Sequence, residues 1–211
     1  MDIPLIILDC FIDITLLIAV IGSAAEGCLY KNLECPDYVV VEQHPDYEVR
    51  SYPALTWATV EEESMFSRIA QMKAFRRLFK YISGKNDKGI TINMTVPVRM
   101  QVTDHESYTA VEMSFMVPSI HANNPPAPND TGITVEKEEP TLYAVRSFPG
   151  YVWRRGTWKE EAQKLADSLK NDDTVIKTKY YQVGYDAPFD FFDRRNEIWM
   201  VKRAGEREKE I

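Results

Sequence analysis

The stretch that decides the fold is Tyr47-Glu-Val-Arg-Ser-Tyr-Pro-Ala-Leu-Thr-Trp57, because the chain repeats it as Tyr143-Ala-Val-Arg-Ser-Phe-Pro-Gly-Tyr-Val-Trp153. Apolar and polar side chains alternate at the start of each copy, which is typical of a half-buried strand. Pro53 and Pro149 predict the end of that strand, since proline has no amide hydrogen for a sheet. Two copies are too few for a solenoid, which needs at least three repeats. The sequence therefore predicts one domain built from two similar halves.

Both halves, about 38–120 and 133–203, have the same predicted order of strand, helix and further strands. The first helix is predicted with Ser64 as its cap, and the second opens with the capping box Thr157-Trp-Lys-Glu160. A proline-rich connector, 121–132, joins the halves. This pattern predicts an α+β domain, with strands around a shared core and a helix on each side. The predicted strands are 38–42, 56–62, 91–102, 108–117, 133–137, 175–185 and 196–202, the segment 142–153 carries the second copy of the repeat, and the helices are 64–82 and 157–170.

The first 25 residues predict a cleavable signal peptide. An uncharged apolar run, 14–21, is followed by small residues at Ser23 and Ala25, as at a signal-peptidase site. Asp9 and Asp13 interrupt any apolar window of the roughly 20 residues that a membrane anchor needs. The leading region has no Lys or Arg, which departs from a typical signal. We expect no stable membrane insertion after cleavage and a location outside the cell or in the secretory lumen.

The lead-in at 26–37 contains Cys28 and Cys35, and this pair predicts a local disulfide in an oxidising compartment. Asn129-Asp-Thr131 is a glycosylation sequon in the connector, so Asn129 is the predicted glycosylation site. A charged tail follows the domain at 204–211.

The charge balance argues against nucleic-acid binding. The chain has 25 Lys and Arg against 32 Asp and Glu, a net charge of −7, whereas phosphate contacts need a basic surface. No recognisable Ser/His/Asp or Cys/His set suggests an enzyme. The oligomeric state stays open.

The first helix carries more apolar surface than packing on one sheet needs. At about 100° of rotation per residue, one arc of Ala and larger apolar side chains is sufficient for the core. Further apolar side chains extend that arc and border a row of cations. They either pack against another part of the fold or bind a flat, apolar molecule with acidic groups at its edge. The core arc is Ala70, Ala74, Leu78, Tyr81 and Ile82; the extension is Met65, Met72, Phe75 and Phe79; the cations are Arg68, Lys73, Arg76, Arg77 and Lys80.

Several motifs in the right order give the chain a resemblance to the SOUL/heme-binding protein family over about 38–203. The resemblance implies a distorted β-barrel flanked by two helices, similar to GyrI-like small-molecule-binding domains. It also implies non-covalent binding of heme or a related tetrapyrrole between the first helix and a late loop, in a carrier or buffer. The motifs are Asn86-Asp-Lys-Gly89, Met94-Thr-Val-Pro-Val98, Pro125-Pro-Ala-Pro-Asn-Asp130, Gly184-Tyr-Asp-Ala-Pro188 and Arg194-Arg-Asn-Glu-Ile-Trp-Met-Val-Lys202.

Carried over by position, the family's helix contacts fall on Met72, Phe75, Phe79 and Lys80, and its loop contacts fall on residues 188–192. Together with the helix pattern, this predicts the binding residues Met65, Arg68, Met72, Phe75, Arg76, Phe79, Lys80, Pro188 and Phe189.

The chain differs from other branches of the family at three positions associated with heme binding. Ser51 stands where one branch has a proposed axial histidine, and Met72 and Asp190 stand where another branch has basic residues. We therefore expect weaker or less iron-specific binding. His44 is a candidate iron ligand because it is the histidine nearest the repeat, but no metal site is predicted around it.

Two other functions use the same features. A carrier of fatty acids or steroids needs the same cleft without an iron ligand, which suits Ser51. A protein-interaction module is the other alternative, because the second helix has a leucine spacing at Leu165 and Leu169 that also fits ordinary core packing.

Overall fold

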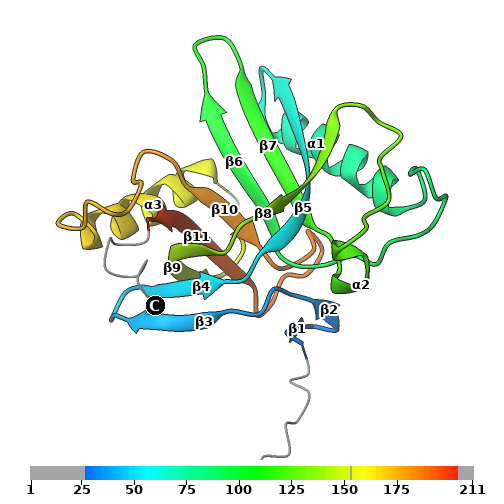
Figure 1. Ribbon diagram of the computed structural model, residues 1–211. Coiled ribbons are helices and arrows are strands. Elements are labelled where there is room, and N and C mark those ends of the chain that lie inside the picture. Colours follow the sequence, from blue (N-terminus) through cyan, green and yellow to red (C-terminus); the bar gives the residue numbers. More distant parts are fainter. Residues whose placement is uncertain (1–26, 153, 204–211) are drawn as a thin grey trace, which may run out of the picture.

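The computed structural model describes residues 27–152 and 154–203, so the predicted signal peptide, the charged tail and Trp153 lie outside the described residues. The elements follow in chain order (Figure 1). The strands are β1 (Leu29–Tyr30), β2 (Leu33–Glu34), β3 (Val39–Gln43), β4 (Glu48–Tyr52), β5 (Leu55–Ser64), β6 (Val98–Asp104), β7 (Thr109–Met116), β8 (Ile133–Glu138), β9 (Thr141–Pro149), β10 (Tyr181–Gly184) and β11 (Arg195–Lys202); the helices are α1 (Ser67–Ile82), α2 (Ser119–Ala122) and α3 (Arg155–Ser168).

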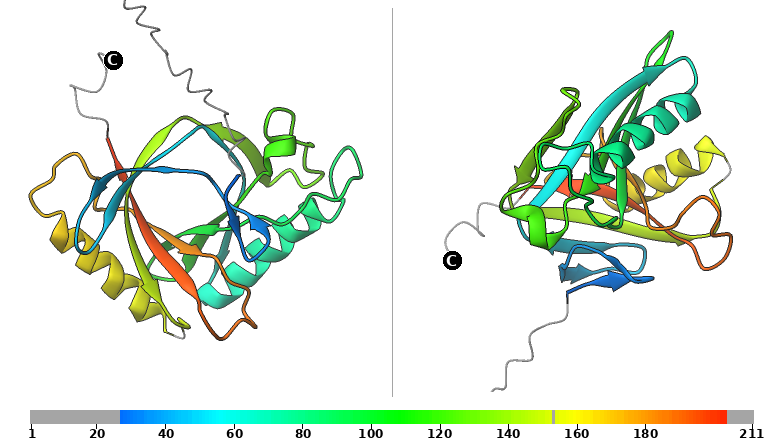
Figure 2. Two further views of the ribbon diagram at one scale, coloured as in Figure 1. Left: turned by 90° about the horizontal axis from the view of Figure 1, so that it is seen from below. Right: turned by 90° about the vertical axis from the view of Figure 1, so that its right-hand side faces the viewer.

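One antiparallel sheet of nine strands organises the molecule, in the order β3-β4-β9-β11-β10-β6-β7-β5-β8. Strands β4 and β5 are separated in sequence only by Pro53 and Ala54, yet they lie near opposite ends of this order. The short link Pro53-Ala54 therefore connects strands near the two ends of the sheet. The sheet curls into the distorted barrel seen end-on in Figure 2. The predicted fold class is confirmed.

The repeat that predicted two halves pairs with its own copy. Glu48 lies opposite Val145 and Val49 lies opposite Ala144 in the antiparallel ladder between β4 and β9. Ala144 and Val145 are the repeat equivalents of Glu48 and Val49, so exchanging the copies leaves the pairing unchanged. A local twofold axis thus passes between these two residue pairs, near the start of each copy of the repeat.

The two long helices lie on the outside of the sheet (Figure 2). Helix α1 packs on β5 and β7, and α3 packs on β9 and β11. The buried residues of α1 are the predicted core arc, from Ala70 to Ile82. On α3 the buried apolar residues are Ala162 and Leu165. Within the described residues, no helix combines the length and the apolar character that crossing a membrane requires.

Both predicted helix caps are wrong. Ser64 is the last residue of β5, and α1 begins after Phe66, which makes no side-chain capping bond. Thr157 lies inside α3, which begins after Arg154 and also lacks a side-chain cap. The strand pattern before α1 continues to Ser64 because β5 pairs with β7 as far as Ser64 and Thr109.

Two predicted strands are shorter than expected. The ladder of β6 begins at Val98, since Pro97 has no amide hydrogen to donate. In the region predicted as 175–185, only β10 joins the sheet, and Val175 makes an isolated bridge to Lys202.

The predicted disulfide between Cys28 and Cys35 is confirmed, with an S–S distance of 2.03 Å. It ties the hairpin of β1 and β2, which packs over the barrel interior: Cys35 is buried in one cluster with Tyr185 and Trp199, and the ring of Tyr30 lies 5.2 Å from that of Tyr185. The lead-in is therefore part of the packed structure.

Candidate ligand-binding surface

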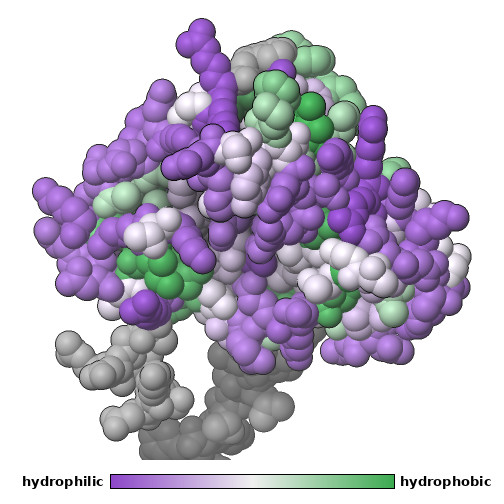
Figure 3. Space-filling model, turned by 90° about the horizontal axis from the view of Figure 1, so that it is seen from above, coloured by the Kyte–Doolittle hydropathy of each residue, from purple (hydrophilic) through white to green (hydrophobic). Residues whose placement is uncertain are grey.

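The outward face of α1 leaves large apolar side chains in solvent. Met72, Phe75 and Phe79 are 47%, 38% and 49% exposed, and Met65, just before the helix, is 76% exposed. Figure 3 shows hydrophobic residues gathered at one edge of the molecule, among hydrophilic neighbours. The predicted apolar extension is therefore not covered by the protein itself.

The phenylalanine pair is held in place by its neighbours. The rings of Phe75 and Phe79 are stacked, with centroids 5.9 Å apart and planes 14° apart. Phe75 also meets the buried ring of Phe115 edge-on at 5.3 Å. The two nearly parallel rings, of which Phe75 is anchored on the core, form an exposed apolar pair, the platform.

Two further residues belong to this surface that the sequence reasoning missed. Phe66 is 65% exposed and Ile69 is 39% exposed. Their spacing of three residues continues to Met72 and Phe75, and that spacing places side chains on one stripe of a helix. This three-residue spacing is the sequence signal from which Phe66 and Ile69 could have been predicted.

Four exposed cations of α1 have no acidic partner among the described residues. Arg68, Lys73, Arg76 and Lys80 are exposed, and within the described residues none of them is in a salt bridge. Arg77 differs from the prediction that it joins this row, because it binds Glu62 at 2.7 Å and Asp130 at 2.5 Å. Its hydrogen bonds hold the pKa of Asp130 below the usual value, so Arg77 fastens the connector to α1.

The predicted loop residues lie between β10 and β11. Pro188 and Phe189 are exposed, as are Phe191 and Phe192. The Tyr151 hydroxyl donates to the Pro188 carbonyl oxygen, and Arg194 donates to the carbonyl oxygens of Ala187 and Asp190, which shapes the loop. In both views of Figure 2 the loop and the two helices lie on the same side of the molecule.

The surface on α1 is open. Three hollows elsewhere in the described structure are lined by other residues: one beside Trp57 and Arg99, one beside the disulfide, and one beside Phe148 and Arg195. None of these three hollows is lined by α1 or by residues 188–192. A ligand would therefore bind on an exposed face there and not in one of these hollows.

The histidines lie away from this face. His44 is in the turn between β3 and β4, stacked on Tyr47 at 4.3 Å and paired with Glu42 at 3.0 Å. That turn is on the opposite side of the molecule from α1 (Figures 1 and 2). Among the residues that the structure describes, no group of three His, Cys, Asp or Glu side chains is arranged to hold a metal ion.

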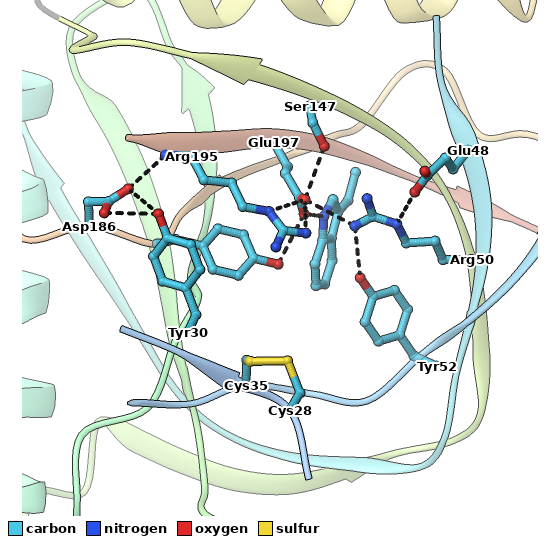
Figure 4. A network of polar contacts seen from close by, with 12 residues as sticks. Cys28, Tyr30, Cys35, Glu48, Arg50, Tyr52, Ser147, Asp186, Arg195 and Glu197 are labelled. Carbon is cyan, nitrogen blue, oxygen red and sulfur yellow. Dashed lines mark hydrogen bonds and ion pairs between the residues drawn. A yellow bond between two sulfur atoms is a disulfide. The ribbon is translucent and has the colours of Figure 1, made fainter. Parts of the chain in front are cut away.

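A polar network inside the barrel is the other concentration of charge (Figure 4). The carboxylate of Glu197, which is fully buried, accepts hydrogen bonds from six donor atoms. Burial raises the pKa of Glu197, but the charges of Arg50 and Arg195 hold it below the usual value. Because every carboxylate oxygen is already occupied by protein donors, this network is structural. The donors are Arg50 Nη1, Ser147 Oγ, Tyr185 OH, Trp199 Nε1 and both Nε and Nη2 of Arg195.

Asn129 is exposed in the connector, and its backbone amide donates to the Lys85 carbonyl oxygen at 3.2 Å. An exposed side chain satisfies one requirement of a glycosylation site, and its use stays a prediction.

Comparisons with known proteins agree on one family. The sequence model described as SOUL heme-binding protein matches residues 33–201. The chain is 31% identical to heme-binding protein 2 of Mus musculus over 189 residues, covering 86% of this chain and 92% of the relative. It is 33% identical to heme-binding protein 1 of Sus scrofa over 165 residues, covering 76% and 86%. Among solved structures, the EcmrR C-terminal domain is similar in fold, with a TM-score of 0.54 and 13% identity over 75% of this chain and 99% of that one.

Proposed function

The chain belongs to the SOUL heme-binding protein family, and we propose that it binds heme non-covalently on the exposed face of α1, as a carrier or buffer and not as an enzyme. The observation that carries this proposal is the platform of Phe75 and Phe79, stacked and about half exposed, on a helix whose exposed cations form no salt bridge with any residue that the structure describes. An exposed apolar patch of this kind marks an interaction site more often than an accident of folding.

The residues present fit the chemistry of heme. Heme has a flat apolar ring and two propionate carboxylates at one edge. The ring would cover the apolar side chains of Phe75, Phe79 and Met72, and the carboxylates would pair with Arg76 and Lys80 on the same helix. Pro188 and Phe189 offer a second apolar wall from the loop on the same side of the molecule.

Iron ligation is the weaker part of the fit. Ser51, where one branch of the family has a histidine, is in β4 and half-buried. The groups on this surface able to ligate iron are the thioethers of Met65 and Met72. The ring and the carboxylates therefore supply the affinity in this proposal, and related tetrapyrroles without iron should bind nearly as well.

We propose that the protein works in an oxidising compartment, secreted or within the secretory lumen. The disulfide of Cys28 and Cys35 supports this, because such bonds persist in oxidising surroundings and are rare in the cytosol. The proposed signal peptide at 1–25 agrees with that location.

Titrating the protein with hemin and following the Soret band tests the proposal. Fully burying a phenylalanine side chain is worth about 1.5–3 kcal/mol, so covering two that are half exposed contributes roughly 2 kcal/mol. The double variant Phe75→Ala, Phe79→Ala should therefore bind hemin roughly 30-fold more weakly. Ile120→Ala, which removes an exposed apolar residue from α2, is the matched control and should bind as the parent does.

The proposal fails if hemin gives no saturable spectral change, or if the double variant and the control bind equally well. Displacement of hemin by a fluorescent fatty acid at comparable concentration would instead favour the general amphiphile carrier.

A further inference from the structure

A hollow on the concave side of the sheet contains two buried donors without acceptors. The hollow has a volume of about 290 Å³ and is lined from β5, β6, β7 and β8, with Trp57 and Arg99 in its wall. These residues are 3% and 5% exposed. Within the described structure, Trp57 Nε1 and Arg99 Nε are both buried and have no hydrogen-bond partner. A buried donor without a partner costs about 1–3 kcal/mol, so two together need an explanation.

The rest of the Arg99 guanidinium is firmly held. Its central carbon lies 4.1 Å from the Trp57 ring centre and 4.4 Å from the Tyr181 ring centre, so it is sandwiched between two aromatic faces. Its Nη1 donates to Glu138 at 2.8 Å and to the Tyr143 hydroxyl at 3.2 Å. The group cannot turn to satisfy Nε without breaking these contacts, and the free donor is therefore built into the site.

The second buried indole of the barrel shows that a free donor is not a general property of this interior. Trp199 is fully buried, and its Nε1 donates to Glu197 at 2.7 Å. There the indole donor meets a carboxylate, whereas Glu138, which lines the hollow beside Trp57, already accepts from Arg99 and Tyr143. An acceptor from outside the chain completes the set around Trp57.

The charged residues that line the hollow indicate which other charge a ligand with this acceptor should have. Arg99 and Lys137 face three carboxylates, Glu112, Glu136 and Glu138. Glu138 is paired with Arg99, whereas Glu112 and Glu136 are in no salt bridge within the described residues. A simple anion would meet these two free carboxylates, and like charges repel. A ligand that brings its own ammonium group avoids that repulsion.

We propose that this hollow binds a small zwitterion, such as a free amino acid, at a site separate from the heme surface. The ligand's carboxylate accepts hydrogen bonds from Trp57 Nε1 and Arg99 Nε, and its ammonium group lies toward Glu112 and Glu136. The volume is at the lower end of the range for small-molecule sites, which suits a ligand of this size.

The test follows the indole N–H resonances of the ¹⁵N-labelled full chain by NMR. The probes are L-alanine, its carboxylate-only analogue propionate, its amine-only analogue ethylamine, and a mixture of the common amino acids. The Trp57→Phe variant identifies the Trp57 resonance and removes the donor while keeping an aromatic ring under Arg99. We expect a saturable shift of the Trp57 resonance with L-alanine or with the mixture, and responses at least about tenfold weaker with both analogues.

Four variants separate binding at this site from effects elsewhere. Trp57→Phe should lose the binding at least about tenfold because it removes the indole donor; this is measured by calorimetry, since the variant has no Trp57 resonance, and its fold is checked by circular dichroism. Glu136→Gln should weaken zwitterion binding but not propionate binding, and Glu139→Gln, an exposed neighbour outside the hollow, should change neither. Phe79→Ala should leave the titration unchanged, which separates this site from the heme surface.

The proposal is overturned if no zwitterion up to about 10 mM shifts the resonance, a concentration tenfold above a 1 mM dissociation constant. Equal responses to L-alanine and propionate overturn it as well, because Glu112 and Glu136 would then have no part in recognition.

Discussion

Helices α1 and α3 occupy equivalent places in the two halves, but their outward faces differ. Each follows one copy of the repeat and packs on the outside of the sheet. The exposed side chains of α3 are hydrophilic and have partners: Lys159 pairs with Asp104, Lys164 pairs with Glu161, and Gln163 donates to Asp167. On α1 the corresponding outward surface is apolar and cationic, and its cations have no salt-bridge partner in the part of the chain that the structure describes. Because α3 holds its place with a satisfied surface, the fold does not require the open surface of α1.

The largest effect on stability should come from the buried face that each helix packs against the sheet. Leu78 of α1 and Leu165 of α3 are both fully buried. Leu78→Ala and Leu165→Ala should each lower the free energy of unfolding by about 2–5 kcal/mol, measured by urea denaturation, because each leaves a cavity in the core. A loss below about 1 kcal/mol for only one of them would show that the two helices are not equivalently seated.

The ends of the helices should respond differently to acid. The α1 end is fastened by Asn86, whose side chain donates to the carbonyl oxygens of Tyr81 and Ile90 and does not titrate. Beyond the α3 end, Asp172 accepts from Lys202 Nζ at 2.6 Å. Burial raises the pKa of Asp172, but hydrogen bonds from Lys202 and Thr174 prevail and lower it to about 2.

Since the folded pKa of Asp172 lies below the unfolded value, its stabilisation is present above about pH 4 and is lost as the pH falls toward 2. We expect Asp172→Asn to be less stable than the parent by roughly 1–2 kcal/mol at pH 6, after allowing for solvent screening. The gap should close between pH 4 and pH 2 in thermal unfolding followed by circular dichroism. A gap that stays constant over that range would mean that Asp172 stabilises the fold without its charge.

The cations of the two helices should differ in their effect on heme. Arg76→Gln with Lys80→Gln should weaken hemin binding roughly fivefold at low salt, because each exposed ion pair contributes about 0.2–1 kcal/mol. The matched change on α3 is Lys159→Gln with Lys164→Gln, whose lysines already pair with Asp104 and Glu161. It should leave hemin binding unchanged.

Heme dimethyl ester, which lacks the carboxylate charges, sharpens this comparison. The loss caused by changing Arg76 and Lys80 should disappear with the ester if the two cations act on the propionates. A loss that persists with the ester assigns them to packing instead.

Most of the fold was predictable because local features of the sequence, prolines and the spacing of apolar residues, define the strands and helices. Pro53 and Pro149 end strands wherever they occur, and the spacing of Ala70, Ala74 and Leu78 defines a buried helix face independently of its partner. The helix starts were not predictable, because Ser64 and Thr157 have good capping chemistry but the sheet extends β5 past one and α3 begins before the other. Tertiary pairing overruled local preference at both places.

The candidate surface was predictable for the same reason, since surplus apolar residues on a helix are visible in its periodicity. Phe66 and Ile69 were not among the predicted residues, although both are exposed on the stripe that leads to Met72 and Phe75. The pairing of Arg77 with Glu62 and Asp130 joins residues 15 and 53 positions apart, and no local pattern indicates such contacts. The hollow beside Trp57 brings together four strands, so only the sheet order reveals it.

The smallest effects should come from the helix starts, which neither helix caps with a side chain. Phe66 and Arg154 stand at the two cap positions. Asp at a cap position accepts a backbone hydrogen bond and suits the helix dipole, so Arg154→Asp should stabilise the protein by about 0.5–1 kcal/mol without affecting hemin binding.

Phe66→Asp should give a similar gain in stability, but it removes an exposed ring from the proposed heme surface, so hemin binding should weaken by about threefold. Thermal unfolding and Soret titration of the same two variants measure both effects. If Phe66→Asp stabilises the protein and binds hemin as the parent does, Phe66 lies outside the binding surface. If it costs affinity, α1 keeps an uncapped start because that position serves the ligand, whereas the uncapped start of α3 serves none.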